Sequence, residues 1–199
     1  MKNKIKILNI SLAAAFIFSI LLSFVTFEAR CEDLRKNVFR LHIIANSDSA
    51  EDQELKLKIR DAILAESETL FSDAESLEDA IILTESKLPQ IKELAMQVIQ
   101  SEGFNYSVKA GVNKAFFDTR VYDDFVLPAG NYDALKIEIG EAKGKNWWCV
   151  LFPSICIGSA GDLTDTARND SAAVAKNPKK YTVRFKVVEW YETIKRKIF

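Results

Sequence analysis

Apolar and polar residues alternate with a period of two in several short stretches, and this pattern predicts strands with one apolar face. The first stretch is "FRLHII" at residues 39–44, where Phe39, Leu41 and Ile43 fall on one face. The same period recurs at residues 104–112, 121–127, 135–139 and 181–187. Such strands predict a sheet with one face in solvent and with helices on the other.

The segment "ANSDSAEDQ" (45–53) is typical of a helix N-terminus. Asp48 and Ser49 can each accept a hydrogen bond from a free backbone N–H group, and Glu51 and Asp52 stand three residues later, as in a capping box. We therefore interpret Asp48, Ser49 and Asp52 mainly as a structural helix cap. The alternative is an anion bound at this helix end, which the nearby carboxylates would repel.

Further helices are expected between residues 72 and 103. A second helix should begin at Ser72 or Ser76, because either hydroxyl can cap it. Pro89 suits the first turn of a third helix, and Gly103 can end that helix. Residues 189–199 should close the chain with a short amphipathic helix, whose basic end lies in solvent or against an anionic membrane surface.

The N-terminal segment has the pattern of a targeting sequence. The 21 residues from Ile7 to Phe27 carry no charge and follow three lysines. A helix of that length spans about 31 Å at about 1.5 Å per residue, enough to cross a bilayer. "VTFEARC" fits a cleavage site poorly, so an uncleaved anchor is favoured over a cleaved signal peptide and over a buried core helix. As signal or anchor, it leaves the lysines in the cytoplasm and exports the rest.

These patterns divide the chain into residues 1–30, a signal peptide or membrane anchor, and residues 31–199, a single exported domain. The expected fold is α+β, a two-layer domain with a mostly antiparallel sheet and helices on one face, preceded by an N-terminal hydrophobic helix. Residues 158–178 lack a period and are expected to form a mobile loop. "GEAKGKN" (140–146) is interpreted as a hairpin turn between two strands.

Composition excludes several classes of protein. The net charge of −1 argues against binding to a phosphate backbone. The chain has one histidine and three cysteines without a C-x-x-C pair, so we expect no metal and no cofactor. With 199 residues, of which 48% are hydrophobic, it can bury the core of one domain.

Cys149 and Cys156 are candidates for a disulfide. A turn centred on residues 152–154 would bring them together, and an exported domain lies in an oxidising compartment. Isolated buried thiols remain an alternative. A third alternative is a thiol hydrolase that uses Cys149 with His42, which requires a proximity that sequence alone does not show.

The stretch "NWWCVLFP" (146–153) differs from the other strands because both of its faces are apolar. Trp147 and Leu151 share one face with Cys149, whereas Trp148 and Phe152 share the other. Either both faces are covered, or one row contacts a partner. The candidate partner-binding residues are Trp147, Trp148, Phe152, Pro153, Arg40 and His42.

Three strings give the chain a family likeness: "FRLHIIANSDSAEDQELKLKIRDAIL", "LPAGNYDALKIEIG" and "NWWCVLFPSIC". Together they resemble stage II sporulation protein R of endospore-forming bacteria, from about Phe39 to Cys156 and again at "YTVRFKVVEW". Two positions depart from the pattern expected of that family. Ala142 stands where a glycine is expected, and "FPSICI" lacks a double proline.

The resemblance implies a signalling protein and not an enzyme. Proteins of this family are made in the forespore, exported across its membrane into the intermembrane space, and needed to activate a membrane-embedded aspartic protease. That protease processes the pro-sigma-E factor in the mother cell. The resemblance thus implies the protease as a partner, with the membrane contacted by the N-terminal segment and no nucleic acid. Besides the thiol hydrolase, the remaining alternative is a membrane-anchored structural component of the septum.

Overall fold

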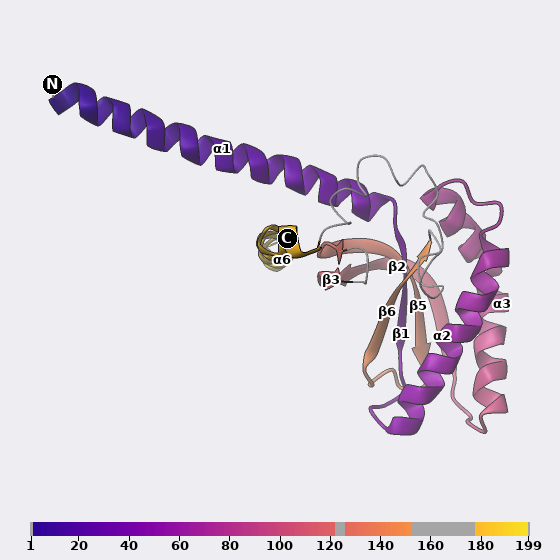
Figure 1. Cartoon of the computed structure of the whole chain (residues 1–199). Helices are drawn as coiled ribbons and strands as arrows, with labels where there is room; N and C mark the ends of the chain where they lie inside the picture. The colour runs from indigo at the N-terminus through magenta and orange to yellow at the C-terminus, as the bar shows by residue number, and fades with distance from the viewer. Residues whose placement is uncertain (1, 122–125, 153–177, 199) are drawn as a thin grey trace. The chain divides into compact units, whose positions relative to one another are not determined.

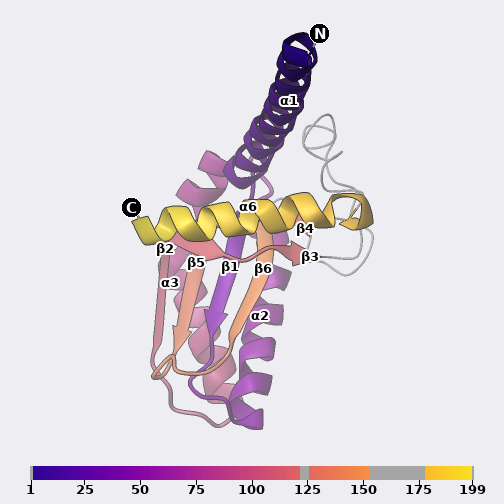
Figure 2. The ribbon, with the colours of Figure 1, turned by 90° about the vertical axis from the view of Figure 1, so that its left-hand side faces the viewer.

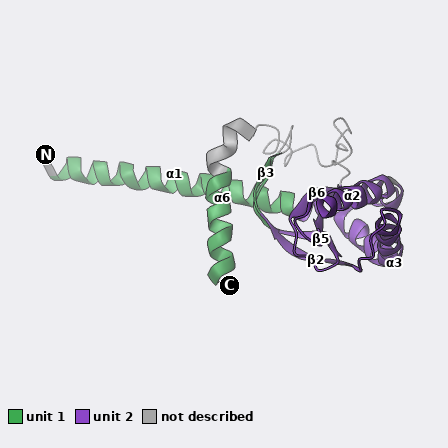
Figure 3. Ribbon diagram, turned by 90° about the horizontal axis from the view of Figure 1, so that it is seen from below, with its two compact units in different colours: residues 1–35, 118–130, 170–199 green, residues 36–117, 131–169 purple. Residues whose placement is uncertain are grey.

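The computed structural model describes residues 2–121, 126–152 and 178–198. They form two compact units, coloured separately in Figure 3. Unit 1 comprises residues 1–35, 118–130 and 170–199, and unit 2 comprises residues 36–117 and 131–169. The predicted mobile loop at 158–178 falls almost wholly outside the described residues.

Unit 2 is a two-layer α+β structure, as the alternating strands predict. Its sheet has the order β2-β5-β1-β6, and α2 and α3 lie together on one side of it (Figures 1 and 2). Strand β1 runs parallel to β5 and antiparallel to β6. The elements are β1 (Phe39–Ile44), α2 (Ala50–Leu70), α3 (Leu77–Ser101), β2 (Val108–Phe117), β5 (Gly130–Ile139) and β6 (Asn146–Phe152). The predicted fold class, including the apolar N-terminal helix, is confirmed.

The core of unit 2 lies between the sheet and the two helices. Strand β1 contributes Phe39, Leu41 and Ile43, all fully buried, and β5 contributes every second residue from Leu135 to Ile139. Helices α2 and α3 face them with a stripe of Leu55, Ile59, Ile63, Ala80, Ile91, Ala95 and Ile99. The period of two in the strands and the helical spacing in α2 and α3 therefore meet in one apolar layer.

The opposite face of the sheet is only partly polar. Lys136 and Glu138 of β5 are half-buried there and form an ion pair. Arg40, Phe117 and Tyr132, which lie on the same face, are each at most 2% exposed. The expectation of a solvent-facing side is therefore wrong for this part of the sheet, because large rings and a guanidinium group fill it.

Helix α3 is one continuous helix, and the prediction that Pro89 opens a separate helix is wrong. Ser76 is the N-cap, and it forms a complete capping box with Asp79. The buried residues Thr84 and Ile91 lie on either side of Pro89 in the same apolar stripe. Pro89 itself is exposed, so the packing of that stripe holds the helix together although proline lacks a backbone N–H.

The loop at 140–145 does not join neighbouring strands, so the hairpin interpretation is wrong. Strand β1 lies between β5 and β6, and the loop crosses the end of β1. Backbone hydrogen bonds from Gly144 to Ala45 (2.9 Å) and from Lys143 to Asn46 (3.1 Å) attach it there. Two strands that each pair with a third need such a crossover, and a period-two pattern does not show which strand lies between them.

Unit 1 combines α1 (Lys2–Lys36) and α6 (Pro178–Ile198) with a two-stranded ribbon of β3 (Arg120–Val121) and β4 (Val126–Leu127). Helix α1 is long and apolar enough to cross a membrane, and its large apolar side chains from Ile5 to Leu22 are exposed. Its C-terminal part packs against α6 and β4. This buried cluster consists of Phe27, Cys31, Leu34, Val126, Phe185 and Val188.

The predicted strand at 181–187 is wrong, because these residues belong to α6. Phe185 and Val188 are buried, whereas Val187, which shares the period-two face of Phe185, is 43% exposed. The burial therefore follows helical spacing. The partner of this segment is a helix, α1, and the ring of Phe185 contacts that of Phe27 at 5.3 Å.

Arg35 of α1 is the polar centre of unit 1. Its side chain is 4% exposed and forms ion pairs with Glu28, with Glu32 at 3.1 Å and with Glu192 of α6 at 3.8 Å. Its Nη1 also donates a hydrogen bond of 2.8 Å to the carbonyl oxygen of Ala129. One guanidinium group thus connects both helices to the segment that follows β4.

Candidate functional site on strands β1 and β6

Strands β1 and β6 place three of the candidate residues on the face opposite to α2 and α3. The register pairs His42 with Trp148 and Arg40 with Val150. Because side chains alternate along a strand, Arg40, His42 and Trp148 point to the same side. Phe117 of β2 and Tyr132 of β5 join them, and we call these five residues the arginine–aromatic cluster.

Arg40 is the buried charged member of the cluster. Its guanidinium carbon lies 4.0 Å from the ring centroid of Phe117 and 5.0 Å from that of Tyr132. Its Nε donates a hydrogen bond of 3.4 Å to the carbonyl oxygen of Cys149. Aromatic faces attract a guanidinium group, and the attraction is stronger when water is excluded. Arg40 therefore acts as an interior scaffold for the cluster.

His42 is held between a ring and an amide. Its imidazole stacks on Trp148, with ring centroids 3.8 Å apart and planes 18° apart. Its Nε2 lies 3.0 Å from Oδ1 of Asn146, which only accepts hydrogen bonds, so this nitrogen carries the proton. Burial lowers the pKa of His42 and outweighs the hydrogen bond to Asn146. The imidazole is therefore neutral near pH 7.

Trp148 is the half-buried member of the cluster. Besides stacking on His42, its ring meets that of Phe117 edge-on at 4.6 Å. Two flanking rings fix its orientation, so it loses little conformational entropy when a partner covers it. Of the candidate residues on this face, Trp148 is the one with a ring that a partner can reach.

Trp147 and Phe152 lie on the other side of the sheet, against the core. The guanidinium carbon of Arg60 lies 4.5 Å from the ring centroid of Trp147, and Phe152 contacts Phe71 at 5.8 Å. The prediction that Phe152 shares a face with Trp148 is wrong, because a bulge shifts the register between Phe39 and Arg40. A bulge places one extra residue in a strand and so reverses the alternation beyond it.

The structure separates the two members of the suggested thiol–imidazole pair. Cys149 pairs with Leu41 in the register and lies in the apolar core, whereas His42 points to the opposite face. A nucleophile and its base must come within hydrogen-bond reach, and these side chains do not. Cys149 is also disulfide-bonded. Cys156 and Pro153 lie outside the described residues, so the predicted Cys149–Cys156 pairing stays a prediction.

The segment that follows β1 builds the start of α2. Ser49 is the N-cap, and its Oγ accepts a hydrogen bond of 3.2 Å from the backbone N–H of Asp52. The Asp52 carboxylate is buried and accepts from Asn46 (2.9 Å) and from Ser47 (2.5 Å). Burial raises the pKa of Asp52, but hydrogen bonds from Ser47, Asn46 and Tyr106 outweigh it and hold that pKa below its usual value.

The same segment also holds the loop between β5 and β6. Oδ1 of Asn46 accepts from the backbone N–H of Glu141 at 2.9 Å, and Oδ1 of Asp48 accepts from that of Lys145 at 2.7 Å. A side chain at Gly144 would collide with the backbone of Ser47. Asp48 therefore holds the crossover loop and does not cap the helix. The polar residues at 46–52 have a structural role: they form the corner between β1 and α2.

The chain matches one protein family over more than half of its length. The model of the family "Stage II sporulation protein R (spore_II_R)" matches residues 35–162, which is more than half of the chain. The chain belongs to this family.

A curated relative, "Stage II sporulation protein R" of Bacillus subtilis (strain 168), is 47% identical over 117 residues. That alignment covers 59% of this chain and 52% of the relative, so the chain matches about half of the relative's length. No solved structure matches the chain. The family match includes the arginine–aromatic cluster and the corner at 46–52, whereas α6 and most of α1 lie outside it.

The departure at Ala142 has a structural consequence. Ala142 has a φ of +52°, the left-handed conformation that favours glycine. Its backbone N–H donates to the carbonyl oxygen of Ile139, so it belongs to the tight turn that begins the crossover. The family likeness leads us to expect glycine here, and the backbone conformation gives the physical reason.

Sequence reasoning missed Phe117, Tyr132 and Asn46. Phe117 and Tyr132 sit in unremarkable apolar stretches, and only the strand order brings them beside Arg40. Asn46 could have been predicted, because an asparagine in a turn after a strand often forms hydrogen bonds with nearby backbone groups. Its partner loop lies 95 residues further along the chain, and nothing local points to it.

Proposed function

We propose that the chain is an exported signalling protein of sporulation. It is made in the forespore, crosses the forespore membrane into the intermembrane space, and activates the membrane-embedded aspartic protease that processes the pro-sigma-E factor in the mother cell. The observation that carries this proposal is the family match over residues 35–162. The long apolar helix α1 supports export.

The geometry of the cluster supports a role in contact. Arg40 is packed between rings, and His42 is stacked and bonded to Asn146, so both polar groups are used inside unit 2. Trp148 is the reachable ring, fixed by its neighbours. An aromatic anchor on a rigid sheet is a common centre of binding energy in protein interfaces. We therefore assign the contact to Trp148 and a supporting role to Arg40 and His42.

The packing of α1 supports retention of the anchor. Phe27, Cys31 and Leu34 lie in the buried cluster of unit 1, and they belong to the same helix as the apolar run that begins at Ile7. Cleavage near residue 30, as a signal peptide would undergo, removes Phe27 from this cluster. An uncleaved chain is thus held in the forespore membrane by the apolar run of α1, with the residues after that run exported.

Activation needs no chemistry from the chain itself. A ligand shifts a two-state equilibrium by the difference between its affinities for the two states. A preference of about 5.5 kcal/mol for the active protease would convert a 1:99 mixture into a 99:1 mixture. Contacts centred on one tryptophan contribute about 2 kcal/mol or more to this preference when they form with the active state alone.

The test is a reconstitution of the full chain with the protease and its precursor substrate in one membrane system, read out by precursor cleavage. Trp148→Ala should reduce cleavage at least tenfold, because about 2 kcal/mol of contact energy is lost. The matched control is Ile82→Ala, which removes a 56% exposed apolar side chain from α3. It should leave cleavage unchanged.

A second variant separates contact from catalysis. His42→Gln keeps a side-chain donor near Asn146 but cannot act as a general base, and it should retain cleavage. Circular dichroism and hydrogen exchange of β1 and β6 establish that each variant is folded. Full cleavage with a folded Trp148→Ala protein would remove Trp148 from the contact, and loss of cleavage with His42→Gln alone would argue for chemistry at the imidazole.

A further inference from the structure

Helix α6 carries an apolar stripe whose side chains are all more than a third exposed. Its members are large side chains spaced by three and four residues, and Trp190 is the most exposed of them at 70%. They are Val187, Trp190, Tyr191, Ile194 and Ile198. At about 100° per residue, these positions fall within an arc of about 100°. We call this set the α6 stripe.

The α6 stripe is distinct from the face of α6 that holds unit 1 together. Phe185, Val188 and Glu192 are buried toward α1. The helical positions place the middle of the stripe about 140° from the middle of that buried face. A two-faced helix of this kind buries one apolar face in its own unit and leaves the second for another apolar medium.

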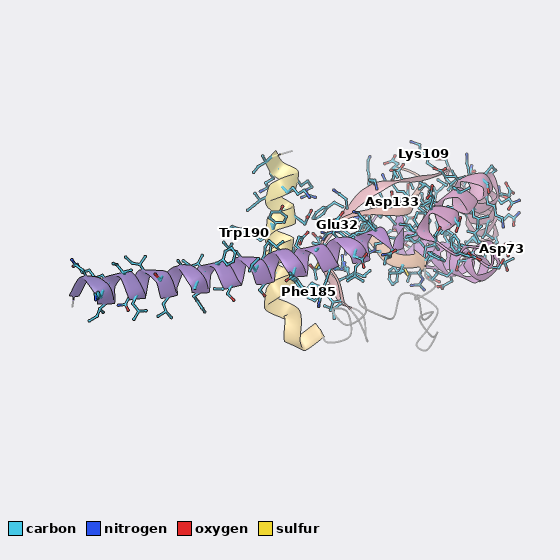
Figure 4. The ribbon with its side chains drawn as sticks, turned by 90° about the horizontal axis from the view of Figure 1, so that it is seen from above. Glu32, Asp73, Lys109, Asp133, Phe185 and Trp190 are labelled. Carbon is cyan, nitrogen blue, oxygen red and sulfur yellow. The ribbon has the colours of Figure 1, made fainter. Side chains whose placement is uncertain are left out.

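The position of α6 along α1 indicates that the α6 stripe faces a membrane surface. The ring of Tyr191 contacts Phe24 at 5.9 Å, and Phe185 contacts Phe27 at 5.3 Å. Phe24 and Phe27 are at the C-terminal end of the uncharged run that begins at Ile7. If this run crosses a bilayer, α6 therefore lies at the surface where α1 leaves it. Figure 4 shows Trp190 on the side of α6 toward the N-terminal part of α1, and Phe185 on the other side.

The side chains beside the stripe suit a phospholipid surface. Lys195, Arg196 and Lys197 are exposed in the last two turns, and Lys195 Nζ lies 6.0 Å from the Tyr191 ring centroid. Basic side chains add about 1 kcal/mol each near anionic headgroups. Tryptophan and tyrosine favour the boundary between headgroups and acyl chains. The nearby acidic groups are paired: Glu192 with Arg35 and, at 3.7 Å, with Lys195, and Glu189 with Lys186 at 3.0 Å.

We propose that α6 lies in the plane of the membrane surface, with the α6 stripe in the interface of an anionic phospholipid bilayer and α1 crossing that bilayer. The proposal rests on the retained anchor of the proposed function, but not on activation of the protease. The chain thus has two membrane-binding elements: a spanning helix at its N-terminus and an interfacial helix at its C-terminus.

The experiment reconstitutes the full chain into vesicles of phosphatidylcholine and phosphatidylglycerol whose acyl chains carry bromine, which quenches tryptophan fluorescence on contact. The chain has three tryptophans, and Trp190 is the one in the stripe. Trp190→Phe should remove most of the quenching. The matched control is Trp147→Phe, which changes a ring packed against the core of unit 2 and should leave the quenching unchanged.

A second pair of variants keeps all three tryptophans. Ile194→Asp places a charge in the stripe and should reduce the quenching, whereas Ile82→Asp changes an exposed apolar residue of α3 and should not. Replacing phosphatidylglycerol by phosphatidylcholine, or raising the salt concentration, should weaken the quenching by wild type, because both reduce the attraction to Lys195, Arg196 and Lys197.

Two results would overturn the proposal. Equal quenching of wild type and Trp190→Phe would show that the stripe does not reach the acyl chains. A Trp190 shielded from aqueous iodide without being quenched by bromine, in a chain that sediments as a dimer in detergent, would assign the stripe to a second copy of the chain. The vesicles contain no protease, so either result leaves the activation assay with Trp148→Ala as a separate test.

Discussion

The two units of the molecule are stabilised by different kinds of contact. Unit 2 buries a continuous apolar layer between four strands and two helices, and hydrogen bonds from Asn46 and Ser47 to Asp52 link the residues of its polar corner at 46–52. Unit 1 has a small apolar cluster, a buried guanidinium group surrounded by carboxylates, and long apolar surfaces that it leaves exposed.

The two units differ in how much apolar surface they leave exposed to water. Unit 2 uses most of its apolar side chains internally, and the half-buried ring of Trp148 is one that a partner can reach on the face opposite to α2 and α3. Unit 1 exposes the apolar residues of α1 and of the α6 stripe, and soluble proteins rarely leave such continuous apolar surface uncovered. Unit 1 therefore has an apolar surface that a membrane or another protein should cover, whereas the surface of unit 2 is that of an ordinary water-soluble domain.

The largest expected effect comes from breaking the polar centre of unit 1. Arg35→Met removes the buried cation from Glu28 and from the buried Glu192, which keeps only the exposed Lys195 at 3.7 Å, and breaking a buried ion pair by removing one partner costs about 3–5 kcal/mol. We expect hydrogen exchange to become faster in α6 and in the C-terminal part of α1, with little change in β1 and β5. Adding Glu192→Gln should restore part of the protection.

The exposed Arg120 of β3 provides the matched control for Arg35. Arg120→Met removes the same group from the same unit without leaving a buried carboxylate, and should leave exchange in α6 unchanged. If the exchange of unit 2 accelerated as much as that of unit 1 in Arg35→Met, the two units would unfold together and the contrast drawn above would fail.

A smaller effect should appear in unit 2 when the pH is lowered. Because the pKa of His42 is lower in the folded protein than its ordinary value near 6.5, the unfolded chain binds the proton more readily. The contribution of His42 to stability is therefore full above pH 6.5 and decreases as the pH falls below it. The slope is at most about 1.4 kcal/mol per pH unit for one proton.

The groups that face His42 are Asn146, Lys136 and Glu138, of which Lys136 lowers and Glu138 raises its pKa. His42 is the only histidine of the chain, which makes His42→Gln a clean comparison. Urea unfolding of wild type between pH 5 and 7, followed by hydrogen exchange of β1, should show the slope. The variant should lose it, and an unchanged slope would assign the proton uptake to another group.

The smallest effect should come from the crossover loop. Ala142→Gly relieves a left-handed conformation that costs an alanine about 1–2 kcal/mol, and the extra backbone entropy of glycine returns about 0.5–1 kcal/mol of this. A net stabilisation of about 0.5–1 kcal/mol is expected in urea unfolding of unit 2. The opposite change at Gly140, which has a φ of +56°, should destabilise the same loop.

Local patterns predicted those elements whose burial is decided by their own side chains. The alternation at 39–44 and at 135–139 predicted β1 and β5, because each of these strands has one face against the helices. Ser76 was one of two predicted helix starts, and it forms the capping box of α3. The N-terminal apolar helix follows from its uncharged run alone.

The structural predictions were wrong where contacts with residues far away in the sequence determine the local structure. Phe185 and Val187 alternate as in a strand, but α1 makes the segment a helix. The crossover at 140–145 looks like a hairpin until β1 is placed between its strands. A single bulge places Phe152 on the core side of the sheet, against Phe71, and no residue type in the sequence indicates this bulge. In the candidate site, Arg40 and His42 are buried in the cluster, and the prediction that they bind a partner stays a prediction.

Helix α1 runs without a break from Lys2 into the buried cluster of unit 1, so no flexible tether separates the apolar run from the folded part. Under the proposed function, a chain whose α1 stays in the membrane would diffuse in two dimensions and would reach only targets in a closely facing membrane. Its range would then be set by the width of the gap between the two membranes and not by how much protein is made.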